Sequence, residues 1–429
     1  MMLRSPPALI MPNSIPKLNL FARAMQAWDE TLPYNAVHSI QINRELDPER
    51  IPMIVSRAIE QHSGLSYLPD KITIEHISPT GDIEEDLRSA NESQLNQRFD
   101  RNHSEPFIRF FILPIDEENF ILGLCYYHLI ASADSICWLL ESIVADYCET
   151  AIPHLDTRPE KRQSSYRWLL LKQAKFFFLW LAGASEFSKK VRAYSRLPRR
   201  HREGAKSRVA TLSLSATQRA WIRDQTKQTG ATFNDVVMGL ALHSLAKHGP
   251  EQASHSRRND LAVSSIVNIR QHFGPQKAGT FGLFLAVFSV SLPLKTIDSL
   301  GETFQRIHKQ TDRIKKDRLY LRNLFYVSFG TFWRKFLSKE QQENLNLKSF
   351  PLAASITNFF VDRFQNHLFD LPVSNYWRSV SSSPATPLVI SATTFKDCMH
   401  LNFIYNDAIY ESEEVASIAD GIAKAMDSL

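Results

Sequence analysis

The spacing of apolar and polar positions predicts that the first half of the chain alternates between strands and helices. Residues 34–43 are predicted to form a strand because their apolar side chains fall at mostly alternating positions. Residues 48–64 are predicted to form a helix that ends before Gly64, because the apolar side chains share one helical face: Ile51, Ile54, Val55 and Ile59.

Three more strands are expected before residue 131, at residues 71–78, 106–115 and 120–130. The polar sequence DEEN at 116–119 separates the last two, which favours an antiparallel hairpin. Tyr127 and His128 lie near the end of the third strand. A side chain that titrates near neutral pH therefore lies where a strand meets a loop.

The helix after this loop is the clearest amphipathic segment. Its apolar side chains form one continuous face, at i, i+3, i+4, i+7, i+8 and i+11: Ile136, Leu139, Leu140, Ile143, Val144 and Tyr147. Ser132 or Asp134 can serve as the N-cap of this helix.

The second half again mixes strands and helices. Strands are expected at 207–215, 260–270, 281–293, 352–360, 387–395 and 398–406, and helices at 216–230, 232–249 and 412–429. No short-period repeat is visible. Two α/β lobes are therefore predicted, residues 1–165 and residues 207–429, joined by a linker at 166–206.

The linker is rich in aromatic and leucine side chains and then becomes strongly basic. Lys172, Gln173 and Lys175 interrupt its apolar run, which is shorter than the about 20 residues that span a bilayer. Two interpretations remain. It is a linker helix that lies against the protein, or an interfacial helix that makes peripheral membrane contact through residues 166–200.

Composition is that of an ordinary globular protein, with 44% hydrophobic and 22% charged residues. The net charge of +5 comes without a nucleic-acid-binding motif, but it suits acidic partners such as carrier proteins or phosphate-bearing cofactors. Three prolines, at 6, 7 and 12, make the N-terminus a poor secretory signal. A cytoplasmic location is expected, with peripheral membrane contact as the alternative.

Several classes of site are not indicated. The four cysteines have no CxxC or zinc spacing and are expected to be free thiols, and the 14 histidines form no HxxxH or HExxH pair, so no metal site is expected. The absence of GxxxxGK[ST], GxGxxG and GxSxG argues against nucleotide hydrolysis, a Rossmann cofactor site and a serine esterase.

The order of landmarks resembles the condensation-domain family of the chloramphenicol-acetyltransferase-like, thioester-dependent acyltransferases. RFD at 98–100 precedes EPFIRFFIL, a hairpin turn and YYHLIASADSICWLLESIVADY; GATFNDVVMGLALHSLAKHG, VNIR, GTFGLFLAVFSVSLPL, SITNFF and LNFIYND follow. The similarity covers roughly residues 15–429. It implies an α/β fold (an α+β sandwich) whose two chloramphenicol-acetyltransferase-like lobes form a V with an interlobe tunnel.

The resemblance also implies roles for particular residues. The HHxxxDG motif of the family aligns with YHLIASA, so that Tyr127 and His128 occupy the two His positions and Ser132 and Ala133 the Asp and Gly positions. His128 is implied as the proton acceptor in acyl transfer, and the backbone N–H of Ala133 as a donor to the oxyanion. For Tyr127, packing in the core and a proton relay are the alternatives.

In the family the motif Asp pairs with an arginine of the other lobe, and Arg270 lies where that arginine is expected. Ser132 can hydrogen-bond a guanidinium but cannot form a bidentate ion pair with it. Asp134, two residues later, is either a substitute for the motif Asp or a simple N-cap.

Two functions follow as alternatives. The first is an acyltransferase that moves an acyl or peptidyl group from a phosphopantetheine thioester, on a carrier protein or coenzyme A, to an amine or hydroxyl. It would hold no permanent cofactor, its acceptor would be a small or lipid-like molecule, and it would serve secondary-metabolite or lipid biosynthesis. The second is a catalytically inactive module that recruits carrier proteins. A His128 ring facing an open tunnel, with Arg270 on Ser132 or Asp134, favours the enzyme. A His128 ring enclosed by Tyr127 and neighbouring side chains favours the module.

Overall fold

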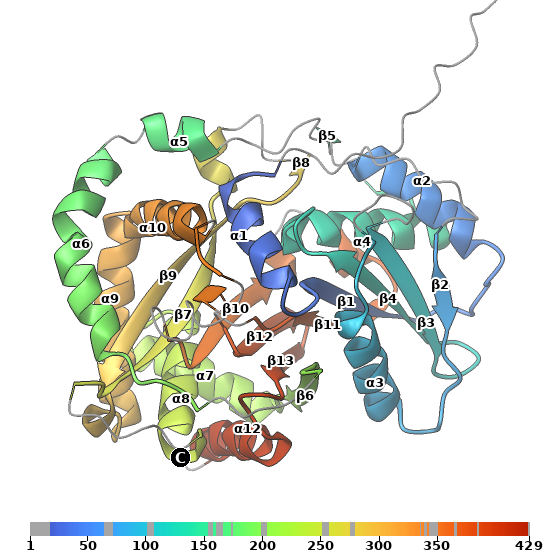
Figure 1. The fold of residues 1–429 in the computed structure, drawn as a ribbon. Helices are drawn as coiled ribbons and strands as arrows, with labels where there is room; N and C mark the ends of the chain where they lie inside the picture. The colour runs from blue at the N-terminus through green and yellow to red at the C-terminus, as the bar shows by residue number, and fades with distance from the viewer. Residues whose placement is uncertain are drawn as a thin grey trace, which may run out of the picture.

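A computed structural model describes most of the chain, and Figure 1 shows two sheets with helices packed around them. The described residues are 18–63, 72–100, 107–152, 158–159, 166–172, 175–198, 204–250, 257–274, 279–334, 336–338, 341–342, 351–363, 367–383 and 386–427. The first residues of the strands predicted at 71–78 and 106–115, and parts of the predicted linker, lie outside these ranges.

The first sheet has the strand order β11-β1-β4-β3-β2. Its strands are β1 (Asn35–Ile42), β2 (Ile74–His76), β3 (Ile108–Pro114), β4 (Phe120–Tyr127) and β11 (Val373–Val380). The antiparallel pairing of β3 with β4 confirms the predicted hairpin. Every residue of β4 is buried. Strand β4 is therefore shielded from solvent along its whole length, up to Tyr127.

Three helices accompany the first sheet: α2 (Ile51–Ser63), α3 (Ile83–Asn96) and α4 (Ala133–Tyr147). Helices α2 and α4 pack together above the sheet in Figure 1, and α3 lies below it against β1. The amphipathic helix predicted after His128 is α4, and its predicted apolar face is buried. Hydrophobic burial thus fixes where α4 begins relative to the end of β4.

The second sheet has the order β6-β13-β12-β10-β7-β9. Its strands are β6 (Ser207–Ser213), β7 (Asp260–Asn268), β9 (Leu285–Pro293), β10 (Ala354–Phe360), β12 (Leu388–Phe395) and β13 (Cys398–Asn406). The helices around it are α7 (Ala216–Thr229), α8 (Phe233–His248), α9 (Leu300–Lys316) and α12 (Ser412–Asp427). Helix α8 packs against both α9 and α12.

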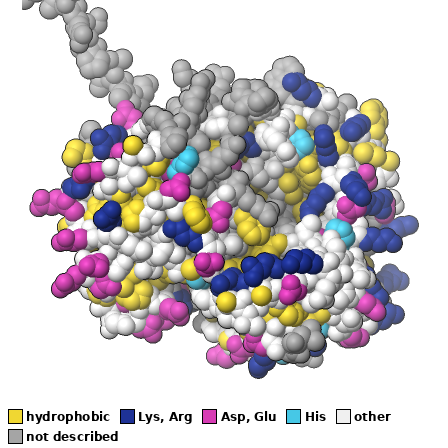
Figure 2. Space-filling view, turned by 180° about the vertical axis from the view of Figure 1, so that it is seen from behind, with side chains coloured by type: hydrophobic (Ala, Val, Ile, Leu, Met, Phe, Trp, Pro, Cys, Tyr) yellow, Lys and Arg dark blue, Asp and Glu magenta, His cyan; other side chains and the backbone are white. Residues whose placement is uncertain are grey.

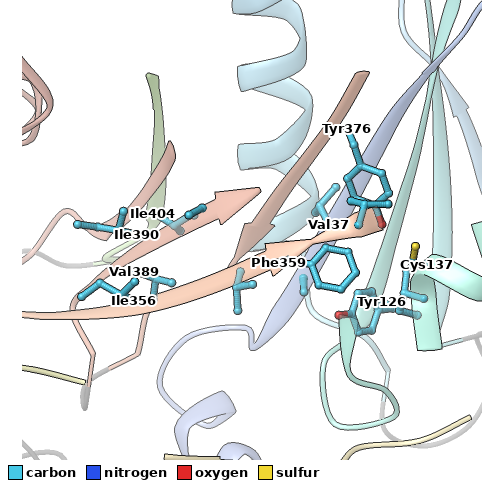
Figure 3. Packing of buried hydrophobic residues seen from close by; sticks show 14 of the residues in the cluster. Val37, Tyr126, Cys137, Ile356, Phe359, Tyr376, Val389, Ile390 and Ile404 are labelled. Carbon is cyan, nitrogen blue, oxygen red and sulfur yellow. The ribbon is translucent and has the colours of Figure 1, made fainter. Parts of the chain in front are cut away.

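The two halves of the chain exchange a strand. Strand β11 follows β10 in sequence but joins the first sheet, where Tyr376 pairs with Ile40 of β1. Short strands β5 (Arg158–Pro159) and β8 (Thr280–Phe281) also pair across the halves. Figure 3 shows Tyr376, Phe359 and Tyr126 close together at this seam. One hydrophobic core therefore extends through both sheets.

The remaining helices are α1 (Leu20–Asp29), α5 (Tyr166–Lys172), α6 (Lys175–Ala193) and α10 (Leu319–Arg334). Helix α10 packs against α1 on one side and α6 on the other. The rings of Phe187 and Tyr326 stack at 3.8 Å between α6 and α10. Helix α6 thus lies against the protein, as one interpretation of the linker expected. Within the described part of the chain, no helix is long and apolar enough to cross a membrane.

The four cysteines are free, as expected, with Cys125 and Cys137 buried.

Gly123 makes the close pairing of β3 with β4 possible. It lies opposite Phe111, and a Cβ at Gly123 would approach the Phe111 ring to 2.1 Å. We therefore expect Gly123→Ala to lower the free energy of unfolding by about 1–3 kcal/mol through overpacking, measured by urea denaturation.

Gly301→Ala in α9 is the matched control, because nothing lies within 4 Å of a Cβ at that position. It should leave stability unchanged or raise it by up to about 1 kcal/mol. Equal stabilities for the two variants would contradict this account of Gly123.

Candidate active site

His128 lies directly after β4, at the turn that leads into α4. Its backbone N–H donates to the Tyr34 carbonyl at 3.1 Å, and the Ile130 N–H donates back to the Tyr127 carbonyl at 3.0 Å. These two bonds close a tight turn at the end of the strand. The side chain of His128 is thereby fixed at the boundary between the two sheets.

The His128 ring is held in one tautomer. Its Nδ1 lies 3.1 Å from the Ala131 carbonyl, and because a carbonyl only accepts, Nδ1 carries the proton. The ring stacks on Tyr34, with centroids 5.8 Å apart, and meets the edge of Tyr126 at 5.5 Å. Nε2 of the neutral ring is then the atom that can accept a proton.

Burial lowers the pKa of His128 to about 4. The hydrogen bond with the Ala131 carbonyl opposes this change, and the positive charge of Arg378 adds to it. At neutral pH the imidazole is therefore uncharged and able to accept a proton.

His128 lines a cavity of about 400 Å³ between the two sheets. The wall is mostly apolar and comes from α1, β4, α10, β7, β9, β10 and β11. Polar groups on the wall include Ser264, Ser355 and Thr357. His128 therefore lines the cavity while only 7% of it is exposed, because the Tyr34 and Tyr126 rings pack on the imidazole.

Asp134 and Arg270 form a buried ion pair that joins the two halves. Arg270 Nε donates to Asp134 Oδ2 at 2.8 Å, and both side chains are at most 8% exposed. Asn268 Nδ2 also donates to Oδ2, at 2.8 Å. The guanidinium lies 4.2 Å from the ring centroid of Phe284 and 4.9 Å from that of Trp138.

Burial alone would raise the pKa of Asp134, but Arg270 and the hydrogen bonds from Ser132 and Asn268 lower it overall. Of the two interpretations of Asp134, the ion pair is observed. Its Oδ1 also accepts from the Ser135 N–H at 2.9 Å, so the carboxylate serves the start of α4 as well.

Ser132 and Ser135 hold the loop through hydroxyl hydrogen bonds to both members of the ion pair. The Ser132 hydroxyl donates to Asp134 Oδ1 at 2.5 Å and lies 2.9 Å from the Gly282 carbonyl. Arg270 Nη2 donates to the Ser135 hydroxyl at 2.9 Å and reaches Ser132 only at 3.4 Å. The ionic role expected of the motif position is thus carried two residues later in the sequence.

Ala133 and Tyr127 lie on opposite sides of the turn. Ala133 is the first residue of α4 and lines the cavity, so its N–H belongs to a helical turn whose donors lack intrahelical acceptors. The Tyr127 ring instead packs on Phe99 and Phe107, and its hydroxyl donates to Asp29 at 3.2 Å. Tyr127 therefore packs in the core.

Arg378 is a cavity residue for which the sequence analysis made no prediction. It lies on β11, lines the same cavity as His128, and is 4% exposed. The strand pattern could have revealed it, because alternation places Tyr376, Arg378 and Val380 on one face. An arginine between two apolar residues on one face of a strand indicates a buried cation.

Three or more metal-ligating side chains do not cluster anywhere in the residues the structure describes.

A mixed α/β fold with two sheets and a histidine at the cavity between them is the arrangement that the resemblance to chloramphenicol-acetyltransferase-like proteins implied. The sequence matches the family described as the Condensation domain over residues 59–429. The chain therefore belongs to the condensation-domain family, which confirms the resemblance inferred from its motifs.

Solved structures of the same fold share little sequence with this chain. The TRI3 trichothecene 15-O-acetyltransferase from Fusarium sporotrichioides superposes with a TM-score of 0.68 at 14% identity, covering 96% of this chain and 94% of that protein. The first condensation domain of the calcium-dependent antibiotic synthetase gives 0.68 at 12% identity, with coverages of 96% and 97%.

The EpoB NRPS cyclization-docking bidomain from Sorangium cellulosum gives 0.64 at 13% identity, with coverages of 96% and 84%. A comparison with curated protein sequences gives no significant match.

Proposed function

We propose that this chain is an acyltransferase of the condensation-domain type. It moves an acyl or peptidyl group from a phosphopantetheine thioester, carried by a carrier protein or coenzyme A, to an amine or hydroxyl. The observation that carries the proposal is the neutral His128 ring, held by Ala131 through Nδ1 while it lines the cavity. Membership of the condensation-domain family supports the reaction class.

One imidazole can carry out both proton transfers of this reaction. His128 Nε2 accepts the proton of the acceptor amine or hydroxyl as its lone pair attacks the thioester carbonyl carbon. The N–H of Ala133 stabilises the oxyanion of the tetrahedral intermediate. The C–S bond then breaks, and the same proton passes to the departing thiolate sulfur. No covalent bond to the protein forms.

A carrier-recruiting module without chemistry is the alternative function. Two observations favour the enzyme over it. The loop keeps a working ion pair through Asp134 and Arg270, and Tyr127 packs away from the His128 face that lines the cavity. The ion pair holds the loop that carries His128 in place, and a mechanism through that imidazole depends on such positioning.

The test is thiol release from acyl-coenzyme A and acyl-carrier-protein donors, with amine and alcohol acceptors supplied together. Acceptor-dependent release supports the acyltransferase and identifies the donor class. Carrier binding without release from any donor would refute it and assign the recruitment module. EpoB and the antibiotic synthetase domain, as similar folds, support carrier proteins and natural-product biosynthesis as the first choices.

We further propose that the acceptor or acyl chain is lipid-like and reaches the cavity from a membrane surface. Helix α10 supports this because one side of it lines the cavity while the other exposes Phe332 and Trp333, and Phe336 is exposed just beyond the end of the helix. These three rings lie 5.4–6.5 Å apart and form an aromatic patch. Phe329 both lines the cavity and is 50% exposed, so the patch reaches the cavity rim.

The helices next to α10 carry further apolar side chains and basic side chains that suit anionic lipid. Helix α6 adds exposed Phe178 and Leu181, and the end of α9 carries exposed Lys315 and Lys316. Figure 2 shows Lys and Arg side chains gathered on the side of α6 and α9. Exposed apolar rings and basic side chains on neighbouring helices are typical of proteins that lie on a membrane interface.

We expect replacement of Phe332, Trp333 and Phe336 by serine to weaken binding to vesicles of phosphatidylcholine and phosphatidylserine. The three exposed rings would be partly buried in the bilayer, so their loss should reduce the partition coefficient for vesicles at least about tenfold, as measured by co-sedimentation. Phe369→Ser, which removes a 53% exposed ring in another part of the fold, is the control and should bind as the parent does. Absence of vesicle binding by the parent protein would contradict the membrane proposal.

A further inference from the structure

Arg378 is a buried cation with only neutral oxygen partners. Its Nε donates to the Ser391 hydroxyl at 3.2 Å, and its Nη2 donates to the hydroxyl and carbonyl of Thr357 at 2.9 and 3.3 Å. Among the residues the structure describes, no carboxylate forms an ion pair with it. The Phe359 ring, whose centroid lies 5.2 Å from the guanidinium carbon, partly stabilises the buried positive charge through a cation–π contact.

Two other buried arginines show how this protein usually satisfies such a charge. Arg270 has the carboxylate of Asp134. Arg109 donates to four oxygens, of Gln94, Gln97 and Arg98, and does not line the cavity. Arg378 has fewer oxygen partners than Arg109 and lines the cavity. Its hydrogen bonds to the described residues use Nε and Nη2, which leaves Nη1 available to a ligand there.

The cavity itself supplies no negative charge to Arg378. The ionisable side chains on its described wall are His128, Arg334, Arg378 and the tyrosines, with no Asp or Glu among them. Burying a guanidinium in such surroundings is costly unless an anion completes the site. Because the rest of the wall is mostly apolar, the molecule that complements this cavity would carry an anionic group on an otherwise apolar body.

We propose that Arg378 binds a carboxylate on the substrate, so that the cavity takes an amphiphilic carboxylic acid as acceptor or acyl group. This inference rests on the proposed function, because it assumes that the substrate occupies the cavity beside His128. A planar guanidinium matches a carboxylate through two parallel hydrogen bonds, which also orients the apolar chain. A bound carboxylate would also offset the positive charge of Arg378, which lowers the pKa of His128.

The test compares octanoate with octanamide, which share a chain but differ in charge, by titration calorimetry at neutral pH without any acyl donor. Octanoate should bind at least about tenfold more tightly, the range of a charge-assisted hydrogen bond in a buried site. Equal affinities for the parent protein, or no binding of either probe, would overturn the proposal.

Variants locate the preference. Arg378→Gln should bring the two affinities level, Arg378→Lys should keep part of the difference, and His128→Ala should keep all of it. The parent comparison decides the matter even if Arg378→Gln fails to fold. Octanoate should also raise the His128 pKa measured by NMR, whereas octanamide should not. A purely structural Arg378 would give neither result.

The two proposals fail separately. Preference for octanoate without thiol release would overturn the acyltransferase and keep the carboxylate site. Thiol release without a preference for octanoate would overturn the carboxylate site and keep the acyltransferase.

Discussion

His128→Ala should reduce acceptor-dependent thiol release by about 100- to 10,000-fold, the usual contribution of a positioned general base. The loss should fall on kcat, because the ring accepts a proton only as the acceptor attacks. His128→Gln keeps a side-chain donor for the Ala131 carbonyl but loses the basic nitrogen, so it should be as inactive as the alanine variant.

His76→Ala is the matched control, because His76 is exposed on β2, outside the cavity wall. It should retain full activity. Both His128 variants should keep the parent's far-UV circular dichroism and its octanoate preference. Activity within about threefold of the parent in His128→Ala would remove the imidazole from the mechanism.

The dependence of rate on pH provides a second check. Burial lowers the His128 pKa to about 4, and the ring must be neutral to act as a base. With an alcohol acceptor, which does not titrate in this range, kcat/KM should therefore stay level from about pH 8 to about pH 5 and fall only near the lowered pKa. An unperturbed histidine would instead give half-loss near about pH 6.5. A midpoint near that value would show that the free ring is solvated, contrary to its position.

Local patterns were sufficient to predict the elements that carry His128. The polar DEEN sequence between the two apolar runs of the β3–β4 hairpin and the helical spacing in α4 are both short-range signals, and both predictions were confirmed. The family resemblance correctly identified the two-lobed fold. The roles assigned to His128 and Ala133 stay predictions, as does the division into residues 1–165, 166–206 and 207–429.

The cavity wall was harder to predict because it is assembled from distant segments. No prediction was made for α1, α10 or β11, which bring Trp28, Tyr326 and Arg378 to one space. Strand β11 leaves one half of the sequence and pairs with β1 of the other, and no local periodicity encodes that choice. Helix α10 is apolar on two sides, so its pattern lacks the single stripe of a surface helix.

Asp134→Ala should be among the most destabilising substitutions in the chain. It leaves the Arg270 guanidinium buried without its carboxylate, and breaking a buried pair in this way costs about 3–5 kcal/mol. The same helix offers a control in Asp146, whose pair with Arg57 joins side chains 41% and 61% exposed. Asp146→Ala should cost less than about 1 kcal/mol, because solvent screens exposed pairs.

Urea denaturation of the two alanine variants measures this difference directly. The pH dependence of the free energy of unfolding should agree with this difference. Since the folded-state pKa of Asp134 is lowered, its contribution is complete above the ordinary Asp value of about 3.9 and is lost as pH falls below it. Equal small losses for Asp134→Ala and Asp146→Ala would mean that the pair does not join the halves.

The double variant Asp134→Leu, Arg270→Met separates the cost of an unpaired charge from the value of the pair. Removing both charges spares the desolvation of either one, so the double variant should be more stable than Asp134→Ala or Arg270→Met alone. Its acyl transfer should nevertheless stay impaired, because Arg270 also donates to the Thr280 carbonyl and the Ser135 hydroxyl beside the catalytic loop. Recovered stability with lost activity would assign the ion pair to positioning the loop that carries His128, whereas recovery of both would reduce it to a structural contact.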